Sequence, residues 1–518
     1  MSALKSRLVA FFVLGSSMSF AQGAAAALAD AGVGDAAAVA AAGSAPTGAA
    51  PPATPAAAQP RKIDPRIFDS ALNDYFTGHP KDAAPKLFDY TENLPSTDEN
   101  YAWAQFFLAK SLIELNLRHA GAVYLARIAR ERSNPAVLPK ALEELQKLTD
   151  LPHDEVMIDE QVFGALDLGF LPEEVAGYAH YQQGLVDLRV GNERWATTHF
   201  SKLTEGSAEA SRAKYAMLVT RLRSAKRDLP KEMVDQFFEL AKDEKLTQEA
   251  RNDAVLAVAR LRYEQQDFKG ALEAYGLVKL AELDTGRATL YLEEAWTRYQ
   301  LGQVHAAMGL LTTLDAPSFR EEFLPDKYLL KALIYRDLCH YLPAKRSAKE
   351  LTRKYAESLE AVREREDLTT DNRLLRAASA RGTTKRARKF LESLELEGEQ
   401  LGRYAGTFGD RMFGYMTRLY DLARAEGQRV YAERLNASVR VEADKLLRAA
   451  EQVRLMEYEV GLKLYERVKR GSKLVPLLEE EPVKPDQVAF KFVDEYWNDE
   501  LRDYRFSLKS RCIEETAR

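Results

Sequence analysis

Isoleucine and cysteine are scarce in this sequence. Only seven of the 518 residues are isoleucine, whereas alanine and leucine are abundant. Because β-branched residues favour strands and alanine and leucine favour helices, the composition excludes an all-β fold and favours an all-α one. The two cysteines, Cys339 and Cys512, form no C-x-x-C pair, which excludes the strongest metal and redox motifs. We expect Cys339 to be a buried free thiol, with a disulfide to Cys512 as the alternative.

The sequence also lacks an excess of one charge and a long apolar run. Its 73 basic and 78 acidic residues give a net charge of -5. A nucleic-acid binder needs a basic footprint, so no nucleic-acid partner is expected. The apolar run at residues 8–14 is far shorter than the ~20 residues of a spanning helix, so no transmembrane segment is expected.

Motifs that carry chemistry are missing. The chain has no H-E-x-x-H, no G-x-x-x-x-G-K-[ST] and no G-x-S-x-G. Ser211 and Lys214 match S-x-x-K, but the partner motifs of that enzyme class are absent, and the seven histidines are scattered. We therefore predict no catalytic, cofactor-binding or metal-binding residue, no cofactor and no small-molecule substrate. The expected protein is not an enzyme.

The N-terminus predicts export. Lys5 and Arg7 precede the apolar residues 8–14, and Ser19-Phe20-Ala21 places small residues at a cleavage site, so residues 1–21 are typical of a secretory signal peptide. Residues 22–60 contain 19 alanines and five prolines, which predicts a disordered linker. The expected location is the periplasm, and peripheral association with an outer-membrane complex is compatible with these features.

A helix-turn-helix pattern recurs over residues 61–360. A small residue, replaced by Met233 in one poorly matching copy, marks each second helix at a spacing of 36 to 38 residues. One gap of 75 accommodates a degenerate repeat at residues 139–176. The pattern predicts about eight repeats. A Gly or Asn between the two helices is expected to adopt the left-handed conformation that ends the first helix. The marking residues are Ala83, Gly121, Ala196, Met233, Ala271, Ala307 and Ala344.

This pattern resembles the tetratricopeptide repeat (TPR) family, whose small and large apolar residues occupy matching offsets. The resemblance implies a right-handed α-solenoid with a concave groove that binds protein. The groove positions of that family imply a set of aromatic and arginine residues, which are types that dominate interface energetics. Carried onto this chain, the set is Trp103, Phe106, Tyr178, Tyr181, Arg260, Tyr263, Trp296, Tyr299 and Arg336. The alternative for each of these residues is that it packs in the core between neighbouring repeats.

The second half of the chain has a different pattern. Residues 361–384 are charge-rich and are expected to form a connector. In residues 385–470, two apolar series with a spacing near 3.5 lie on either side of Gly427. They predict a long antiparallel helical hairpin with coiled-coil-like packing and a turn at Gly427. Four glycines between Gly402 and Gly414 crowd the first arm and predict a kink or a closely packed neighbour.

Residues 471–518 form a linker and an aromatic tail. The aromatic residues would expose a sizeable apolar patch if they were free. We expect them to dock on this chain's own helices, and insertion into a partner is the alternative. The predicted docking residues are Phe490, Phe492, Tyr496, Trp497 and Tyr504.

Together these features predict a non-enzymatic periplasmic scaffold that binds proteins of a bacterial envelope complex. Its combination of signal peptide, linker, repeats and aromatic tail resembles envelope TPR proteins associated with gliding motility. One alternative is a chaperone of outer-membrane or pilus assembly or of secretion. Another is a cell-wall enzyme of the lytic transglycosylase type. The heptad-like pattern after residue 385 disfavours it, because this pattern predicts helix packing and not the mixed polar and apolar pocket that a catalytic acid with a raised pKa needs.

Overall fold

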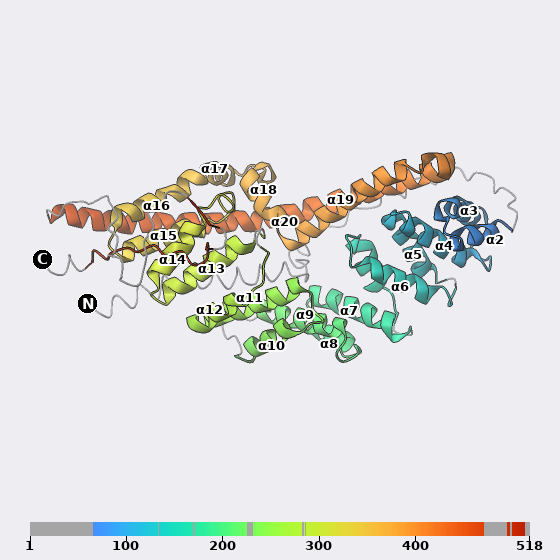
Figure 1. Cartoon of the computed structure of the whole chain (residues 1–518), viewed down its shortest axis with the longest axis horizontal. Coiled ribbons are helices and arrows are strands. Elements are labelled where there is room, and N and C mark those ends of the chain that lie inside the picture. Colours follow the sequence, from blue (N-terminus) through green and yellow to red (C-terminus); the bar gives the residue numbers. More distant parts are fainter. Residues whose placement is uncertain are drawn as a thin grey trace. The chain divides into compact units, whose positions relative to one another are not determined.

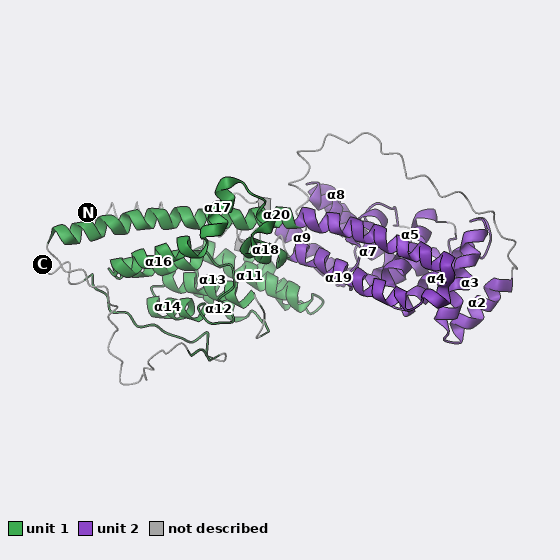
Figure 2. Ribbon diagram, turned by 90° about the horizontal axis from the view of Figure 1, so that it is seen from above, with its two compact units in different colours: residues 1–28, 225–381, 435–518 green, residues 29–224, 382–434 purple. Residues whose placement is uncertain are grey.

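The computed structural model describes residues 66–132, 134–168, 171–224, 231–281, 284, 286–470, 495–497 and 500–512. These residues are helical or irregular and contain no strand, which confirms the all-α prediction (Figure 1). The predicted signal peptide and linker lie outside the described residues, as do Phe490 and Phe492. The chain divides into two compact units (Figure 2). Unit 1 includes residues 225–381 and 435–518, and unit 2 includes residues 29–224 and 382–434.

Unit 2 is built from consecutive short helices and one long pair. α2 packs on α3, α3 on α4, α4 on α5 and α5 on α6. The helices are α2 (Arg66–Phe76), α3 (Pro80–Asn93), α4 (Tyr101–Glu114), α5 (Arg118–Glu131), α6 (Leu138–Leu148), the π-helix η1 (Val156–Phe163), α7 (Glu173–Arg189), α8 (Glu193–Phe200), α9 (Ala208–Ser224), α19 (Gly382–Gly402) and the first part of α20 (Ala405–Lys469).

Unit 1 repeats the arrangement of short neighbouring helices. α10 packs on α11, and each later helix up to α16 packs on the one before it. The expected connector, residues 361–384, contains the end of α17, η2, α18 and the start of α19. The helices are α10 (Lys231–Lys242), α11 (Gln248–Glu264), α12 (Phe268–Gly276), α13 (Gly286–Gln300), α14 (Val304–Thr313), α15 (Asp326–Asp337), α16 (Tyr341–Lys354), α17 (Ala356–Glu364), the 3₁₀-helix η2 (Leu368–Thr370), α18 (Asn372–Ser379) and the rest of α20.

Six of the turns between paired helices are closed by the same pair of backbone hydrogen bonds. In one of them, the Gly302 N–H donates to the Tyr299 carbonyl, and the Gln303 N–H donates to the Arg298 carbonyl. These two bonds form the Schellman motif, which satisfies the last carbonyls of the first helix. The left-handed residue of each turn is Gly78, Asn116, Gly191, Gln266, Gly302 or Cys339. The expectation that Gly or Asn adopts this conformation is confirmed, and Gln266 and Cys339 adopt it too.

Small residues allow the paired helices to approach closely. Ala271 and Ala307 have no exposed surface, and a Cβ added to Gly121 of α5 would lie 2.6 Å from Ile113 Cγ1 of α4. A larger side chain at such a position would overpack the helix contact. The marking residues of the repeat pattern therefore lie in the core, where their size sets the distance between helices.

The long hairpin turns at a different place from the one predicted. The Thr384 hydroxyl lies 3.4 Å from the Arg434 carbonyl, and the Tyr420 hydroxyl donates to Glu397 at 2.6 Å, so α19 and the first part of α20 run antiparallel. The chain reverses between Gly402, where α19 ends, and Gly409, whose non-helical φ of 68° and ψ of 163° interrupt the start of α20. Gly427 lies inside α20, where an added Cβ would be 2.9 Å from Leu391 Cδ2 of α19. The expected turn at Gly427 is therefore wrong, because this glycine serves close helix packing instead.

Candidate functional site

The described part of the chain contains no candidate metal centre. Its His, Cys, Asp and Glu side chains form no group that could hold a metal ion. None of its helices has the length and apolar content needed to cross a membrane.

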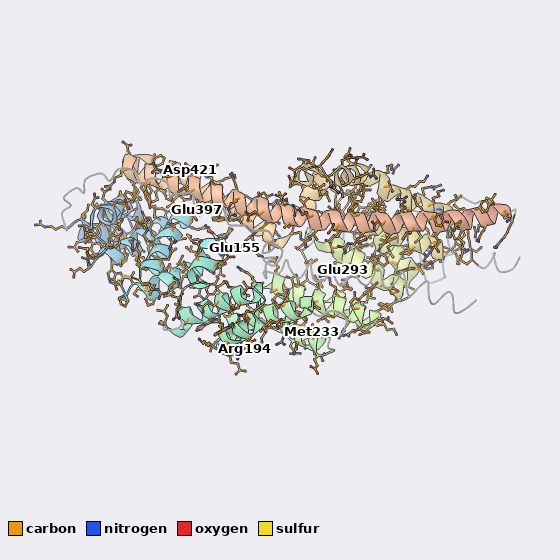
Figure 3. The ribbon with its side chains drawn as sticks, turned by 180° about the vertical axis from the view of Figure 1, so that it is seen from behind. Glu155, Arg194, Met233, Glu293, Glu397 and Asp421 are labelled. Carbon is orange, nitrogen blue, oxygen red and sulfur yellow. A yellow bond between two sulfur atoms is a disulfide. The ribbon has the colours of Figure 1, made fainter. Side chains whose placement is uncertain are left out.

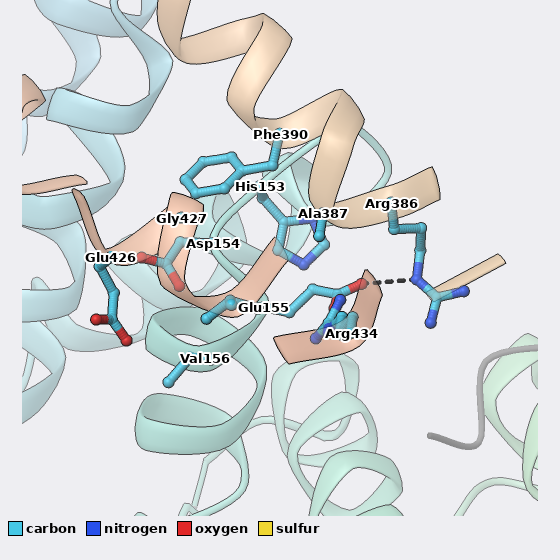
Figure 4. Close-up of a pocket in the computed structure, with 11 residues that line it drawn as sticks. His153, Asp154, Glu155, Val156, Arg386, Ala387, Phe390, Glu426, Gly427 and Arg434 are labelled. Carbon is cyan, nitrogen blue, oxygen red and sulfur yellow. Dashed lines mark hydrogen bonds and ion pairs between the residues drawn. The ribbon is translucent and has the colours of Figure 1, made fainter. Parts of the chain in front are cut away.

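One small pocket in unit 2 lies beside a half-buried ion triad (Figure 4). Glu155 precedes η1 and pairs with Arg386 of α19 at 2.7 Å and with Arg434 of α20 at 2.6 Å. Burial acts to raise the pKa of Glu155, but the two guanidinium groups outweigh it and lower this pKa to about 2. The cavity has a volume of about 20 Å³, which is room for about one water molecule. The triad links η1 to the hairpin through its two ion pairs. The cavity beside it is too small to bind a substrate.

Five of the predicted groove residues are buried within their own unit. These are Phe106, Tyr178, Arg260, Tyr263 and Trp296, each at most 8% exposed. Trp103, Tyr181, Tyr299 and Arg336 are half-buried. For the five buried residues the groove assignment is wrong in this structure, because neighbouring helices already cover the side chains.

The contacts of the buried group explain this correction. Arg260 of α11 forms a bidentate pair with Glu293 of α13, with N–O distances of 2.8 and 3.0 Å (Glu293 is labelled in Figure 3). Burial acts to lower the pKa of Arg260, but the Glu293 carboxylate keeps it raised. Tyr178 packs edge-on against Phe163, with ring centroids 4.8 Å apart. Such desolvated pairs hold helices together and leave no donor or ring face for a partner.

Half-buried members of the predicted set also contact their own chain. The Tyr299 hydroxyl donates to Asp337 at 2.5 Å, and Arg336 pairs with Glu459 of α20 at 3.0 Å. Trp103 stacks on Phe107 with ring centroids 6.0 Å apart. The face of α15 that carries Arg336 is therefore in contact with the C-terminal part of α20.

The C-terminal tail docks on the helices of unit 1 through its backbone. The Phe506 N–H donates to the His305 carbonyl at 3.0 Å, and the Arg511 N–H donates to the Leu338 carbonyl at 3.1 Å. The His340 Nε2 lies 2.8 Å from the Lys509 carbonyl, and the Thr313 hydroxyl donates to the Leu501 carbonyl. Docking on the chain itself is confirmed for residues 500–512.

The side chains that anchor the tail differ from the predicted ones. Leu501 and Leu508 are 2% and 1% exposed, whereas Tyr496 and Tyr504 are half-buried and Trp497 is 57% exposed. The tail passes directly over α14 at Gly309, where an added Cβ would lie 1.6 Å from the Tyr504 carbonyl oxygen. In the sequence, this contact is marked only by a glycine inside a helix. The role of Gly309 becomes clear once the tail is seen to pass over it.

A disulfide fixes the end of the tail. Cys339 and Cys512 are bonded, with their Cα atoms 5.2 Å apart. The expectation of a free thiol at Cys339 is therefore wrong. Cys339 is the left-handed residue between α15 and α16, so the bond attaches the tail to a turn. Spacing in the sequence does not reveal this pairing, because 173 positions separate the two cysteines.

The C-terminal part of α20 carries an exposed apolar stripe. Leu455, Tyr458, Leu462 and Tyr465 are 60%, 70%, 47% and 67% exposed. Their spacings of three, four and three residues place them on one face of the helix. Val453, Met456 and Val460 are buried in unit 1 instead. We call the four exposed residues the α20 stripe.

No protein-family model matches this chain. No curated protein matches it either. The functional interpretation therefore depends on the geometry of the described residues and on the sequence patterns.

Proposed function

We propose that this protein is an exported, non-enzymatic scaffold of the TPR type that binds another protein of a bacterial envelope complex. The observation that carries the proposal is the α20 stripe. Four large apolar side chains at heptad spacing are 47–70% exposed on one helix face. Contiguous exposed apolar surface is costly for a soluble protein and usually marks an interaction site.

The partner that fits the stripe is an amphipathic helix. A seam with spacings of three and four residues accepts the side chains of a second helix with the same repeat. Arg454 and Lys469 flank the stripe and have no ion-pair partner among the described residues. Acidic residues beside the apolar seam of the partner would complement these charges. The proposed occupant is thus an apolar helix with acidic flanks on a different protein.

The compartment is part of the proposal. The disulfide between Cys339 and Cys512 supports an oxidising environment, as does the predicted signal peptide. The bacterial periplasm is oxidising and receives proteins that carry a signal peptide. A role in a motility machine is the narrower form of the proposal and is supported by the sequence resemblance alone.

The test combines two variants in the cells that make the protein. Tyr458→Ser with Leu462→Ser removes the centre of the α20 stripe, and Leu396→Ser with Leu422→Ser is the control, because that pair is also exposed but lies in unit 2. We expect both purified variants to melt like the wild type, because none of the four side chains is buried. Only the stripe variant should lose the larger envelope complex in sedimentation of gently solubilised membranes.

Two outcomes would contradict the proposal. Retention of the complex by the stripe variant would show that the partner binds elsewhere. A purified wild-type protein that dimerises, and a stripe variant that is monomeric, would show that the stripe binds a second copy of this chain.

A further inference from the structure

A second cavity, in unit 1, lies where the docked tail meets α14, α15 and α16. Its volume is about 450 Å³, within the usual range of small-molecule sites of about 300–1,000 Å³. Helix side chains form most of its wall, and Tyr496 and Phe506 of the tail complete it. The motifs of the sequence give no sign of this cavity, because its wall comes from segments that are far apart along the chain.

The wall of the cavity is strongly basic. Among the described residues, four cations line it, Arg320, Lys327, Lys331 and Lys354, together with the carboxylate of Asp315, and these groups leave three positive charges in excess. Asp315 is shared, because its carboxylate lies 2.5 Å from Lys327 Nζ and 3.6 Å from Lys331 Nζ. One carboxylate therefore neutralises only part of the charge.

Two further observations show that these cations are not otherwise satisfied. Arg320 is exposed, and its guanidinium has no ion pair among the described residues. Lys354 donates from Nζ to the Arg320 carbonyl at 2.7 Å and forms no ion pair among the described residues, although Glu321 and Asp315 act on its charge from a greater distance. Outside the wall, Glu350 acts on Lys331 and Glu321 acts on Lys354, while two further cations, Arg353 and Arg346, lie near Tyr328 and Tyr335. The surroundings therefore do not remove the positive excess.

Burial makes this excess significant. Lys327 is only 4% exposed, and burial together with the neighbouring Lys331 and Lys354 lowers its pKa, even though Asp315 acts in the opposite direction. Burial likewise lowers the pKa of Lys354. Cations that are held close together in a partly desolvated wall bind an anion more strongly than the same charges spread over a surface.

Most of the remaining wall is aromatic, and Met308 and Thr312 of α14 complete it. Tyr328 and Tyr335 of α15 and Phe506 and Tyr496 of the tail line the cavity beside the cations. Aromatic side chains give a ring-shaped ligand flat apolar contacts, while the basic groups fix an anionic substituent. We propose that this cavity binds a sugar that carries a carboxylate or a phosphate, with Arg320 and Lys331 contacting the anionic group. The site is independent of the α20 stripe.

The test is isothermal titration calorimetry of the purified, oxidised full chain at low salt. Glucuronate probes a sugar carboxylate, glucose 6-phosphate probes a sugar phosphate, and glucose and inorganic phosphate are the separate halves of the ligand. We expect at least one anionic sugar to bind, more tightly than inorganic phosphate, and glucose not to bind. Which anionic sugar binds better will distinguish acidic polysaccharides from phosphorylated glycans as the natural source.

Variants locate the site. Arg320→Gln should weaken binding about tenfold, since it removes one charge-assisted contact from an exposed side chain whose loss does not affect folding. Arg363→Gln on α17 is the matched control, because its guanidinium is exposed and pairs only with Glu360. Asp315→Asn removes the competing carboxylate and should strengthen binding, whereas mere damage to the fold would weaken it. Absence of binding by both anionic sugars, or equal binding by the Arg320→Gln and Arg363→Gln variants, would overturn the proposal.

Discussion

Two segments cover short helices in this protein, one in each unit, and they are attached by different means. In unit 2 the hairpin of α19 and α20 is attached through side chains. Glu397 accepts hydrogen bonds from the His119 N–H at 2.9 Å and from the Tyr420 hydroxyl, while Met412 and Met416 are buried in the same core. In unit 1 the tail at residues 500–512 buries the side chains of Leu501 and Leu508, but most of its specific bonds are hydrogen bonds of its backbone, with one ion pair and a disulfide.

This difference decides what each attachment depends on. Side-chain attachment requires a periodic apolar face, which α19 and α20 display in their sequence. Backbone attachment requires only free N–H and carbonyl groups and a path without obstruction, which almost any sequence can supply. The tail should therefore be sensitive to anything that blocks its path or opens its covalent bond, and the hairpin to the loss of individual buried groups.

The largest effect should come from the disulfide. Cys512→Ser opens a loop of 173 residues, and the loss of such a bond costs about 2–4 kcal/mol of unfolding free energy. We expect the variant, or the reduced wild type, to melt earlier and to expose residues 500–512 to proteolysis. Differential scanning calorimetry with limited proteolysis checks this. Equal melting of the oxidised and reduced proteins would show that the backbone bonds alone hold the tail.

The ion triad of unit 2 should come next. The folded protein holds the pKa of Glu155 at about 2, below its usual 4.5, so its carboxylate stabilises the fold at neutral pH. That contribution is lost as the pH falls from about 4.5 to about 2. Glu155→Gln should cost roughly 2 kcal/mol at pH 7 and little at pH 2. Chemical denaturation across this pH range tests the prediction, and a cost independent of pH would contradict it.

A pair of glycine substitutions separates tail docking from helix propensity. Gly309→Ala places a methyl group in the path of the Tyr504 carbonyl and should cost about 1–2 kcal/mol. Gly461→Ala, in α20, has no neighbour within 4 Å and should stabilise the helix by up to about 1 kcal/mol. Opposite shifts in melting temperature are expected. Shifts of the same sign would show that the tail does not pass over α14.

The smallest effect is predicted for Glu264 of α11. Burial raises the pKa of its carboxyl from 4.5 to about 7, so the folded state binds the proton more tightly than the unfolded state. Burying the ionised carboxylate therefore lowers the free energy of unfolding above pH 7 and has no effect at pH 4. Stability falls as the pH rises from 4 to 7. Glu264→Gln should melt a few degrees higher at pH 8 and unchanged at pH 4. A stabilisation of equal size at both pH values would exclude this cause.

Local features of the fold could be predicted from the sequence. The left-handed conformation of Gly302 and the burial of Ala271 and Ala307 follow from turn chemistry and from the size of the residue, which act within one pair of helices. The turn of the long hairpin could not be located in this way, and Gly427 lies inside α20 instead. An apolar series with a period near 3.5 continues unchanged through a helix, and a glycine within it signals close packing as readily as a turn.

Features that depend on distant segments could not be predicted. The TPR resemblance placed Arg336 in the protein-binding groove, but the sequence does not show that Glu459 lies opposite it. The pairing of Cys339 with Cys512 and the basic cavity beside the tail depend on the same long-range placement. Conversely, the α20 stripe is formed from one helix, yet it appears as a surface only once Val453 and Val460 are known to face the core.

The central claim is that the α20 stripe binds an amphipathic helix of a different envelope protein. Photo-crosslinking in living cells tests it most directly, with benzoylphenylalanine at Tyr458 and, as the control, at Phe76, which is 71% exposed in unit 2. We predict that mass spectrometry finds cross-links from position 458, and none from position 76, to a helix with apolar heptad positions and acidic flanks. Cross-links from position 458 that join only copies or segments of this chain would contradict the claim.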